Sequence, residues 1–186
     1  MKIKTLFIII ILIIAILILK NMVFYDKYKM PKDVEIIMAD KEIEVYDKTN
    51  LYDLIENSNV QILTQNEEID YMTIGEHTYT LEYKHKVKKY LCDVKYNVID
   101  SVSPIFINVP SKKTFYVNEA DEESLTKKVS YADNYDTKPE LRIEGKVDFG
   151  EVGKYKIQYI VMDQSGNETV KDAVIEIKER QEEKIQ

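Results

Sequence analysis

The amino-acid sequence predicts an all-β protein, built from tandem antiparallel β-sandwiches behind an N-terminal transmembrane helix. Three observations predict it. In the run 154–161, Tyr155, Ile157, Tyr159 and Val161 share one face and Lys154, Lys156 and Gln158 the other, and a second alternating run at 173–177 follows a Ser-Gly-Asn turn, as in a half-buried β-hairpin. A pattern similar to this one occurs about 78 residues earlier in the chain. The chain also begins with a strongly apolar segment.

The first element is the apolar segment Leu6–Leu19, which follows two lysines. As a helix it rises about 21 Å, less than the roughly 30 Å of a bilayer core. Apolar residues resume at Met22–Tyr25, and Lys20 can snorkel to the interface, which extends the span to about twenty residues. No small-x-small cleavage pair follows the segment. We therefore predict an uncleaved signal anchor over residues 1–25, with cleavage and secretion as the alternative.

The predicted location is the cell membrane, with a single pass and the C-terminal domains extracytoplasmic. Lysines flank the apolar segment on both sides, so the positive-inside rule does not assign the orientation. The outward placement rests instead on the export-signal character of an apolar N-terminus behind lysines. Residues 26–33 then form a charged stem, in which Pro31 acts as a breaker.

The formal net charge of −7 excludes one class of partner. A protein that binds the phosphates of nucleic acid is expected to carry a basic face, so we predict no nucleic-acid partner. The single cysteine excludes an intrachain disulfide framework. Because Cys92 shares a face of the alternating run 89–99 with apolar neighbours, it is predicted to be a small core residue.

Two series of strands follow the stem. The domains are predicted at residues 34–99 and 100–178, divided by a break at Asp100–Pro104, and residues 179–186 form a charged tail. The strands predicted in the first domain are 34–38, 43–46, 60–63, 77–83 and 89–99, with a helical turn at 49–56. Those predicted in the second are 105–109, 114–117, 128–132, 141–144 and the two hairpin strands, with loops at 118–123 and 134–139.

A weak internal repeat relates the two domains. Ile69-Asp70-Tyr71 with Gly75 parallels Val147-Asp148-Phe149 with Gly153, and an alternating apolar run follows each glycine. A repeat of about 78 residues predicts tandem domains rather than one large sandwich.

The second domain carries an ordered series of short motifs. They are Asp100-x3-Pro104, Ala132-Asp133-Asn134-x-Asp136, Gly145-x-Val147-Asp148, Gly153-x-Tyr155-x-Ile157-x-Tyr159 and Asp163-x-Ser165-Gly166-Asn167. The series resembles the bacterial immunoglobulin-like domains of cell-surface proteins, a type also found in pesticidal crystal proteins. The resemblance covers about residues 100–178 and implies an immunoglobulin-like β-sandwich that acts as a spacer or adhesive module. Residues 34–99 lack the Asp-x-x-Asp pair and the Ser-Gly-Asn turn, so only the repeat extends the resemblance to them.

The sequence contains few residues in the arrangements that are typical of catalytic sites. No Ser, Cys or Thr lies in a nucleophile-elbow context, and no Gly-rich phosphate loop precedes a helix. The spacing of His77, His85 and Cys92 matches no common metal-ligand pattern. We predict neither an enzyme nor a catalytic residue, and no cofactor apart from the calcium ion considered next.

Five loop residues of the second domain suggest a calcium site. They are Asp100, Asp133, Asp136, Asp163 and Asn167. Successive strands of a sandwich run in opposite directions, so the domain's entry and these loops are expected at one end. Carboxylate and amide oxygens are the ligands that Ca²⁺ prefers, and an ion there would stiffen the link to the preceding domain. The alternative is turn chemistry, because Asp and Asn side chains hydrogen-bond their own backbone in turns.

Structural roles are predicted for Gly153 and Tyr155. The glycine allows a close backbone approach or a positive φ, and the tyrosine places its hydroxyl against a loop, similar to a tyrosine corner. The chain has 14 tyrosines and no tryptophan, and most of the tyrosines occupy alternating strand positions, where they fill the core. Tyr116, Tyr131 and Tyr135 lie nearer loops and are the candidates for a binding surface.

The predicted function is that of a non-catalytic, membrane-anchored cell-surface protein whose domains act as spacers or as adhesive, protein-binding modules. The predicted partners are the membrane, through the N-terminal helix, and a cell-wall glycan or a protein. A module that binds glycan or cell wall and an accessory subunit of a membrane complex are the alternatives.

Overall fold

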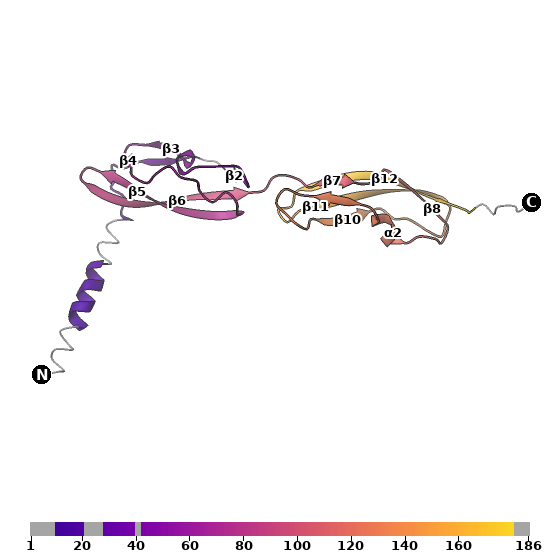
Figure 1. The fold of residues 1–186 in the computed structure, drawn as a ribbon, viewed down its shortest axis with the longest axis horizontal. Coiled ribbons are helices and arrows are strands. Elements are labelled where there is room, and N and C mark those ends of the chain that lie inside the picture. Colours follow the sequence, from indigo (N-terminus) through magenta and orange to yellow (C-terminus); the bar gives the residue numbers. More distant parts are fainter. Residues whose placement is uncertain (1–9, 21–27, 40–41, 181–186) are drawn as a thin grey trace, which may run out of the picture. The chain divides into compact units, whose positions relative to one another are not determined.

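The structure, a computed structural model, describes residues 10–20, 28–39 and 42–180. The chain divides into two compact units, Met1–Ile99 and Asp100–Gln186. β-Strands dominate both units (Figure 1). The all-β fold class that the alternating runs predict is therefore confirmed.

The first unit contains two sheets. Its strands are β1 (Ile36–Met38), β2 (Glu42–Glu44), β3 (Ile55–Ser58), β4 (Gln61–Ile62), β5 (Gly75–His85) and β6 (Lys88–Ile99). One sheet pairs β1 with β3, and the other has the order β2-β6-β5-β4. Between β2 and β3 the chain forms a 3₁₀ helix, η1 (Leu51–Leu54), whose two leucines are buried.

The β5–β6 hairpin supplies much of this unit's core, because its apolar side chains alternate along each strand. Leu81, Tyr83, Val94 and Val98 are fully buried. Cys92 lies opposite Leu81 in the hairpin and is half-buried. Burial raises the pKa of its thiol, which leaves the sulfur protonated and weakly nucleophilic.

The second unit also contains two sheets. Its strands are β7 (Ile105–Asn108), β8 (Lys112–Tyr116), β9 (Ser130–Ala132), β10 (Glu140–Glu144), β11 (Gly153–Met162) and β12 (Glu168–Lys178). One sheet pairs β7 with β9, and the other has the order β10-β11-β12-β8. β11 and β12 form the antiparallel hairpin that the sequence predicts, and β8 pairs with β12 in parallel.

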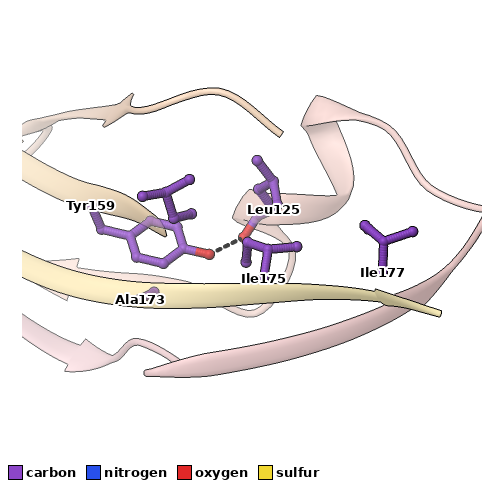
Figure 2. Close-up of a cluster of buried hydrophobic side chains, with 6 residues drawn as sticks. Leu125, Tyr159, Ala173, Ile175 and Ile177 are labelled. Carbon is purple, nitrogen blue, oxygen red and sulfur yellow. Dashed lines mark hydrogen bonds between the residues drawn. The ribbon is translucent and has the colours of Figure 1, made fainter. Parts of the chain in front are cut away.

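The core of the second unit is built mainly on this hairpin (Figure 2). The buried cluster consists of Leu125, Ile157, Tyr159, Ala173, Ile175 and Ile177. The hydroxyl of Tyr159 donates a hydrogen bond to the backbone carbonyl of Leu125, at 2.9 Å. Burial raises the pKa of this phenol, so the hydroxyl keeps the proton that it donates. The bond joins β11 to the short helix α2 (Glu122–Thr126).

The two units share one topology, strand for strand. The sheet order β4-β5-β6-β2 in the first unit corresponds to β10-β11-β12-β8 in the second, and the pair β1-β3 corresponds to β7-β9. In both units the second strand runs parallel to the last. A helical turn connects the second strand to the third in both, η1 in one and α2 in the other.

Two elements differ from the sequence-based expectation. Helix α2 extends over part of the expected loop 118–123, because Asp121 accepts the backbone N–H of Ser124 and the Ser124 hydroxyl completes a capping box. In the segment 49–56 the helical turn ends at Leu54, and strand β3, which the sequence analysis missed, begins at Ile55.

The predicted signal anchor is described only in part. Residues 10–20 are helical, and the large apolar side chains from Ile10 to Leu19 are exposed. Residues 1–9 and 21–25 lie outside the described residues. Among the residues that are described, no helix is both long and apolar enough to cross a membrane.

The segments predicted as stem and tail both contact their units where they are described. In the stem, Asp33 lies 3.2 Å from the Lys86 ammonium. In the tail, the Arg180 guanidinium lies 2.8 Å from Glu119 and over the Tyr116 ring. Residues 26–27 and 181–186 lie outside the described residues.

Candidate metal centre

Three aspartates from three different loops of the second unit lie close together. Asp100 precedes β7, Asp133 follows β9 and Asp163 follows β11. One carboxylate oxygen from each residue lies within 4.8 Å of the others. The structure therefore brings together three of the four aspartates in the predicted calcium site.

Backbone groups orient two of these carboxylates. The Oδ2 atom of Asp133 accepts the backbone N–H groups of Tyr135 and Asp136, at 2.9 and 2.8 Å. Similarly, Oδ1 of Asp163 accepts the backbone N–H of Asn167 at 2.8 Å. These are the local Asx bonds that the turn-chemistry alternative expects, and each uses only one oxygen of its carboxylate for the backbone.

The remaining oxygens of two of the aspartates are buried without a partner. Asp100 is 6% exposed, and Asp133 is half-buried. Neither Asp100 Oδ2 nor Asp133 Oδ1, both inaccessible to solvent, has a hydrogen-bond partner. Such groups are rare in folded proteins, because each unmade bond costs about 1–3 kcal/mol, and more for a charged group.

The electrostatic balance of the cluster is also unfavourable. Burial raises the pKa of Asp100, and the charges of Asp133 and Asp163 raise it further, against hydrogen bonds from Val102 and Asn134 that lower it. Within the described part of the chain, none of the three aspartates forms an ion pair with a lysine or an arginine. A hard divalent cation would supply the missing positive charge and bind the free oxygens.

Two amide side chains hold the cluster together. Asn167 Nδ2 donates to Asp163 Oδ2 at 2.8 Å and to the carbonyl oxygen of Asp100 at 3.0 Å. Asn134 Nδ2 donates to Asp100 Oδ1 at 3.3 Å. The predicted ligand Asn167 thus turns its nitrogen toward the aspartates, and Asn134 is a member that the sequence analysis missed.

Asp136 has a different place from the one predicted. It is buried, and its oxygens accept the backbone N–H groups of Lys138 at 2.9 Å and of Gln164 at 3.1 Å. The Gln164 side chain also donates to it. Asp136 therefore ties the loop after β9 to the loop after β11 and stands outside the group of three.

The two predicted structural residues contact each other. The Tyr155 hydroxyl donates to the carbonyl oxygen of Glu151 at 3.0 Å, in the turn that precedes β11. A Cβ added at Gly153 would lie 3.2 Å from the Tyr155 ring, and Gly153 is not among the positive-φ residues. Of the two roles considered for Gly153, the geometry corresponds to a close approach.

The three tyrosines proposed as a binding surface do not form one platform. Tyr116 pairs with Lys178 at the C-terminal end of β12. Tyr135 lies in the Asp133 turn, beside the Asp163 turn that leads into the opposite end of β12. A strand of this length extends over about 30 Å. Tyr131 is half-buried on β9, opposite Phe106.

Comparison with protein families identifies the second unit. Residues 122–177, which include α2, the Asp133 and Asp163 loops and the β11–β12 hairpin, match the family model described as a bacterial surface protein, Ig-like domain. None of the curated proteins compared with the chain matches it. The family that the ordered motifs predict is confirmed, and the second unit carries a bacterial surface Ig-like domain.

Proposed function

We propose that this protein is a non-catalytic cell-surface protein, anchored in the membrane, whose Ig-like domains act as spacers or adhesive modules. The observation that carries the proposal is the family match over residues 122–177 to a bacterial surface Ig-like domain. The Ig-like match supports exposure at the cell surface, where a rigid β-sandwich can hold a binding surface away from the lipid.

The shared topology of the two units supports a tandem array. The match itself lies in the second unit, but the first unit repeats its sheet order and its parallel pairing of the second and last strands. Independent origins rarely reproduce a whole strand order together with an equivalent helical turn. We therefore assign residues 34–99 to a second, diverged Ig-like domain.

The exposed apolar helix supports membrane anchoring. Its described part, residues 10–20, presents isoleucine and leucine side chains that are 45–61% exposed. Apolar surface in water costs about 25 cal/mol per Å², so such a helix is expected to be covered, and lipid would cover every face. Secretion after cleavage would instead remove the segment.

Cell fractionation with surface proteolysis tests this function. A C-terminal epitope tag should sediment with membranes and resist extraction with carbonate, and protease added to intact cells should remove it. Recovery of the tag in the culture medium would favour cleavage and secretion. Protection of the tag until the cells are lysed would contradict display at the surface.

Binding assays separate the spacer role from the alternatives. The detergent-solubilised protein should not sediment with purified cell wall if it is a spacer, whereas a glycan-binding module should. Exchange of residues 1–25 for an unrelated anchor should leave a spacer functional. Loss of function after this exchange would instead support an accessory subunit that associates through its helix.

A further inference from the structure

The loops of the first unit that correspond to those of the aspartate cluster also meet at one place, here called the corner of the unit. In the first unit this corner contains a positively charged side chain, that of Lys86. Asp33 precedes β1 as Asp100 precedes β7. The Lys86 ammonium lies 3.2 Å from Asp33 Oδ2, and His85 Nε2 lies 3.3 Å from the same atom. Lys86 and His85 stand at the end of β5, in the place of the Asp163 turn at the end of β11.

The strand registers extend this correspondence to the third position. Ile36 pairs with Ser58 in β1–β3, and Ile105 pairs with Ala132 in β7–β9. The residues that follow are Asn59 in the first unit and Asp133 in the second. Asn59 accepts the backbone N–H of Glu35 at 2.9 Å and donates to the Asp33 carbonyl at 3.0 Å, so it is satisfied as a neutral side chain.

The two corners therefore differ in charge while their backbones correspond. The corner of the first unit has one carboxylate, one amide, a histidine and a lysine, and the lysine hydrogen bond lowers the pKa of Asp33. The corner of the second unit has three carboxylates and two buried oxygens without a partner, and among the described residues no lysine or arginine forms an ion pair with these three aspartates. A buried negative cluster of this kind needs a counter-charge from outside the chain.

We propose that Asp100, Asp133 and Asp163 bind one Ca²⁺ ion, which supplies in the second unit the positive charge that Lys86 supplies in the first. Oxygens within 4.8 Å of one another can surround a cation with ligand distances of about 2.4 Å. Ca²⁺ accepts six to eight oxygens in irregular arrangements, whereas Mg²⁺ requires a smaller octahedron. Backbone carbonyls and water complete such a shell.

Neighbouring residues position the ligands of this site. Asn167 bridges Asp163 and the Asp100 carbonyl, and Asn134 holds one oxygen of Asp100. Asp136 joins the two loops through Gln164. This proposal concerns the second unit alone, and it does not depend on where the protein resides or what it displays.

Calcium titration of the full-length chain in detergent, by calorimetry and thermal unfolding, tests the proposal. The key variant is Asp133→Asn, because the asparagine Oδ1 can still accept the two turn N–H groups while the charge is removed. The matched control is Asp148→Asn, an exposed turn aspartate whose Oδ1 accepts the Gly150 N–H at 2.9 Å.

We expect one Ca²⁺ per chain in the wild type and in the Asp148→Asn control, and at least tenfold weaker binding in Asp133→Asn. In EDTA the Asp133→Asn variant should melt no lower than the wild type, whereas in calcium the wild type should melt higher. Absence of calcium binding up to about 5 mM, above the 0.1–1 mM range of extracellular modules, would overturn the proposal. Equal calcium affinity in Asp133→Asn, or equal stabilisation by Mg²⁺, would also overturn it.

Discussion

The hydroxyl of Tyr159 and the backbone carbonyl of Leu125 are joined by a buried hydrogen bond of 2.9 Å, although the residues are 34 positions apart. The carbonyl belongs to the short helix α2 and the tyrosine to the central strand β11. A helix of one turn has little stability of its own, so this bond and the burial of Leu125 hold it against the sheet.

Replacement of Tyr159 with Phe removes this bond, and the Leu125 carbonyl then keeps the Lys113 ammonium, at 2.6 Å, as its donor. We expect the free energy of unfolding to fall by about 0.5–1.5 kcal/mol, the net contribution of one hydrogen bond, measured by urea denaturation. Tyr116→Phe is the control, because Tyr116 is 42% exposed and should change stability by less than about 0.5 kcal/mol. Equal effects of the two substitutions would show that the Leu125 bond does not contribute.

Replacement of Tyr155 with Phe tests the second tyrosine contact. It removes the hydrogen bond to the Glu151 carbonyl but keeps the ring that packs over Gly153. We expect the melting temperature to fall by a few degrees, less than for Tyr159→Phe, because water can replace this more exposed donor. An unchanged melting temperature would count against a stabilising tyrosine corner formed by Tyr155 and the Glu151 carbonyl.

Glycine substitutions separate backbone strain from steric overlap. Gly166 has φ = 92° with nothing near the position of a Cβ, whereas a Cβ at Gly145 (φ = 108°) would lie 2.7 Å from the Lys156 carbonyl oxygen. Gly166→Ala should therefore cost about 1–2 kcal/mol from strain alone. Gly145→Ala should cost more, about 3 kcal/mol or above. Urea denaturation measures both, and a smaller loss at Gly145 would contradict the close approach.

The raised pKa of Asp100 predicts how the calcium-free protein responds to pH. Burial, reinforced by Asp133 and Asp163, makes the folded state hold this proton more tightly than the unfolded state. The contribution of Asp100 to stability is therefore present below the ordinary carboxyl pKa of about 4, and it is lost as the pH rises through the raised folded pKa.

Melting curves of the wild type and of Asp100→Asn in EDTA check this prediction. The melting temperature of the variant, relative to that of the wild type, should rise as the pH is raised from about 4 to about 7. Calcium at pH 7 should raise the melting temperature of the wild type relative to that of the variant, because only the ionised carboxylate binds the ion. Parallel pH profiles of the two proteins in EDTA would exclude an elevated Asp100 pKa.

The sequence predicts strands best where alternation is long. The runs that form β5, β6, β11 and β12 have the period of two that a half-buried strand requires. β3 (Ile55–Ser58) has no such pattern, since only its first residue is apolar. Helix α2 was missed for a related reason. Its acidic sequence is typical of a loop, and the capping contact of Asp121 is what begins a helix there.

The aspartate cluster was predictable in position but not in detail. Strand alternation places the entry of the domain and the turns after β9 and β11 at one end, which groups Asp100, Asp133 and Asp163. Which carboxylates turn inward depends on hydrogen bonds between loops. Asp136 turns to the backbone of Gln164, and nothing local in the sequence distinguishes it from Asp133.

The last strand of each unit lies inside its sheet, with β2 and β5 beside β6, and β8 and β11 beside β12. A pulling force applied to the end of β12 acts along the strand, while the hydrogen bonds to both neighbours lie across it. Extraction of β12 therefore requires sliding past two partners at once, instead of peeling away one bond at a time. The position of the last strand therefore gives each unit resistance to a pulling force along that strand, because the hydrogen bonds to two neighbours must break together.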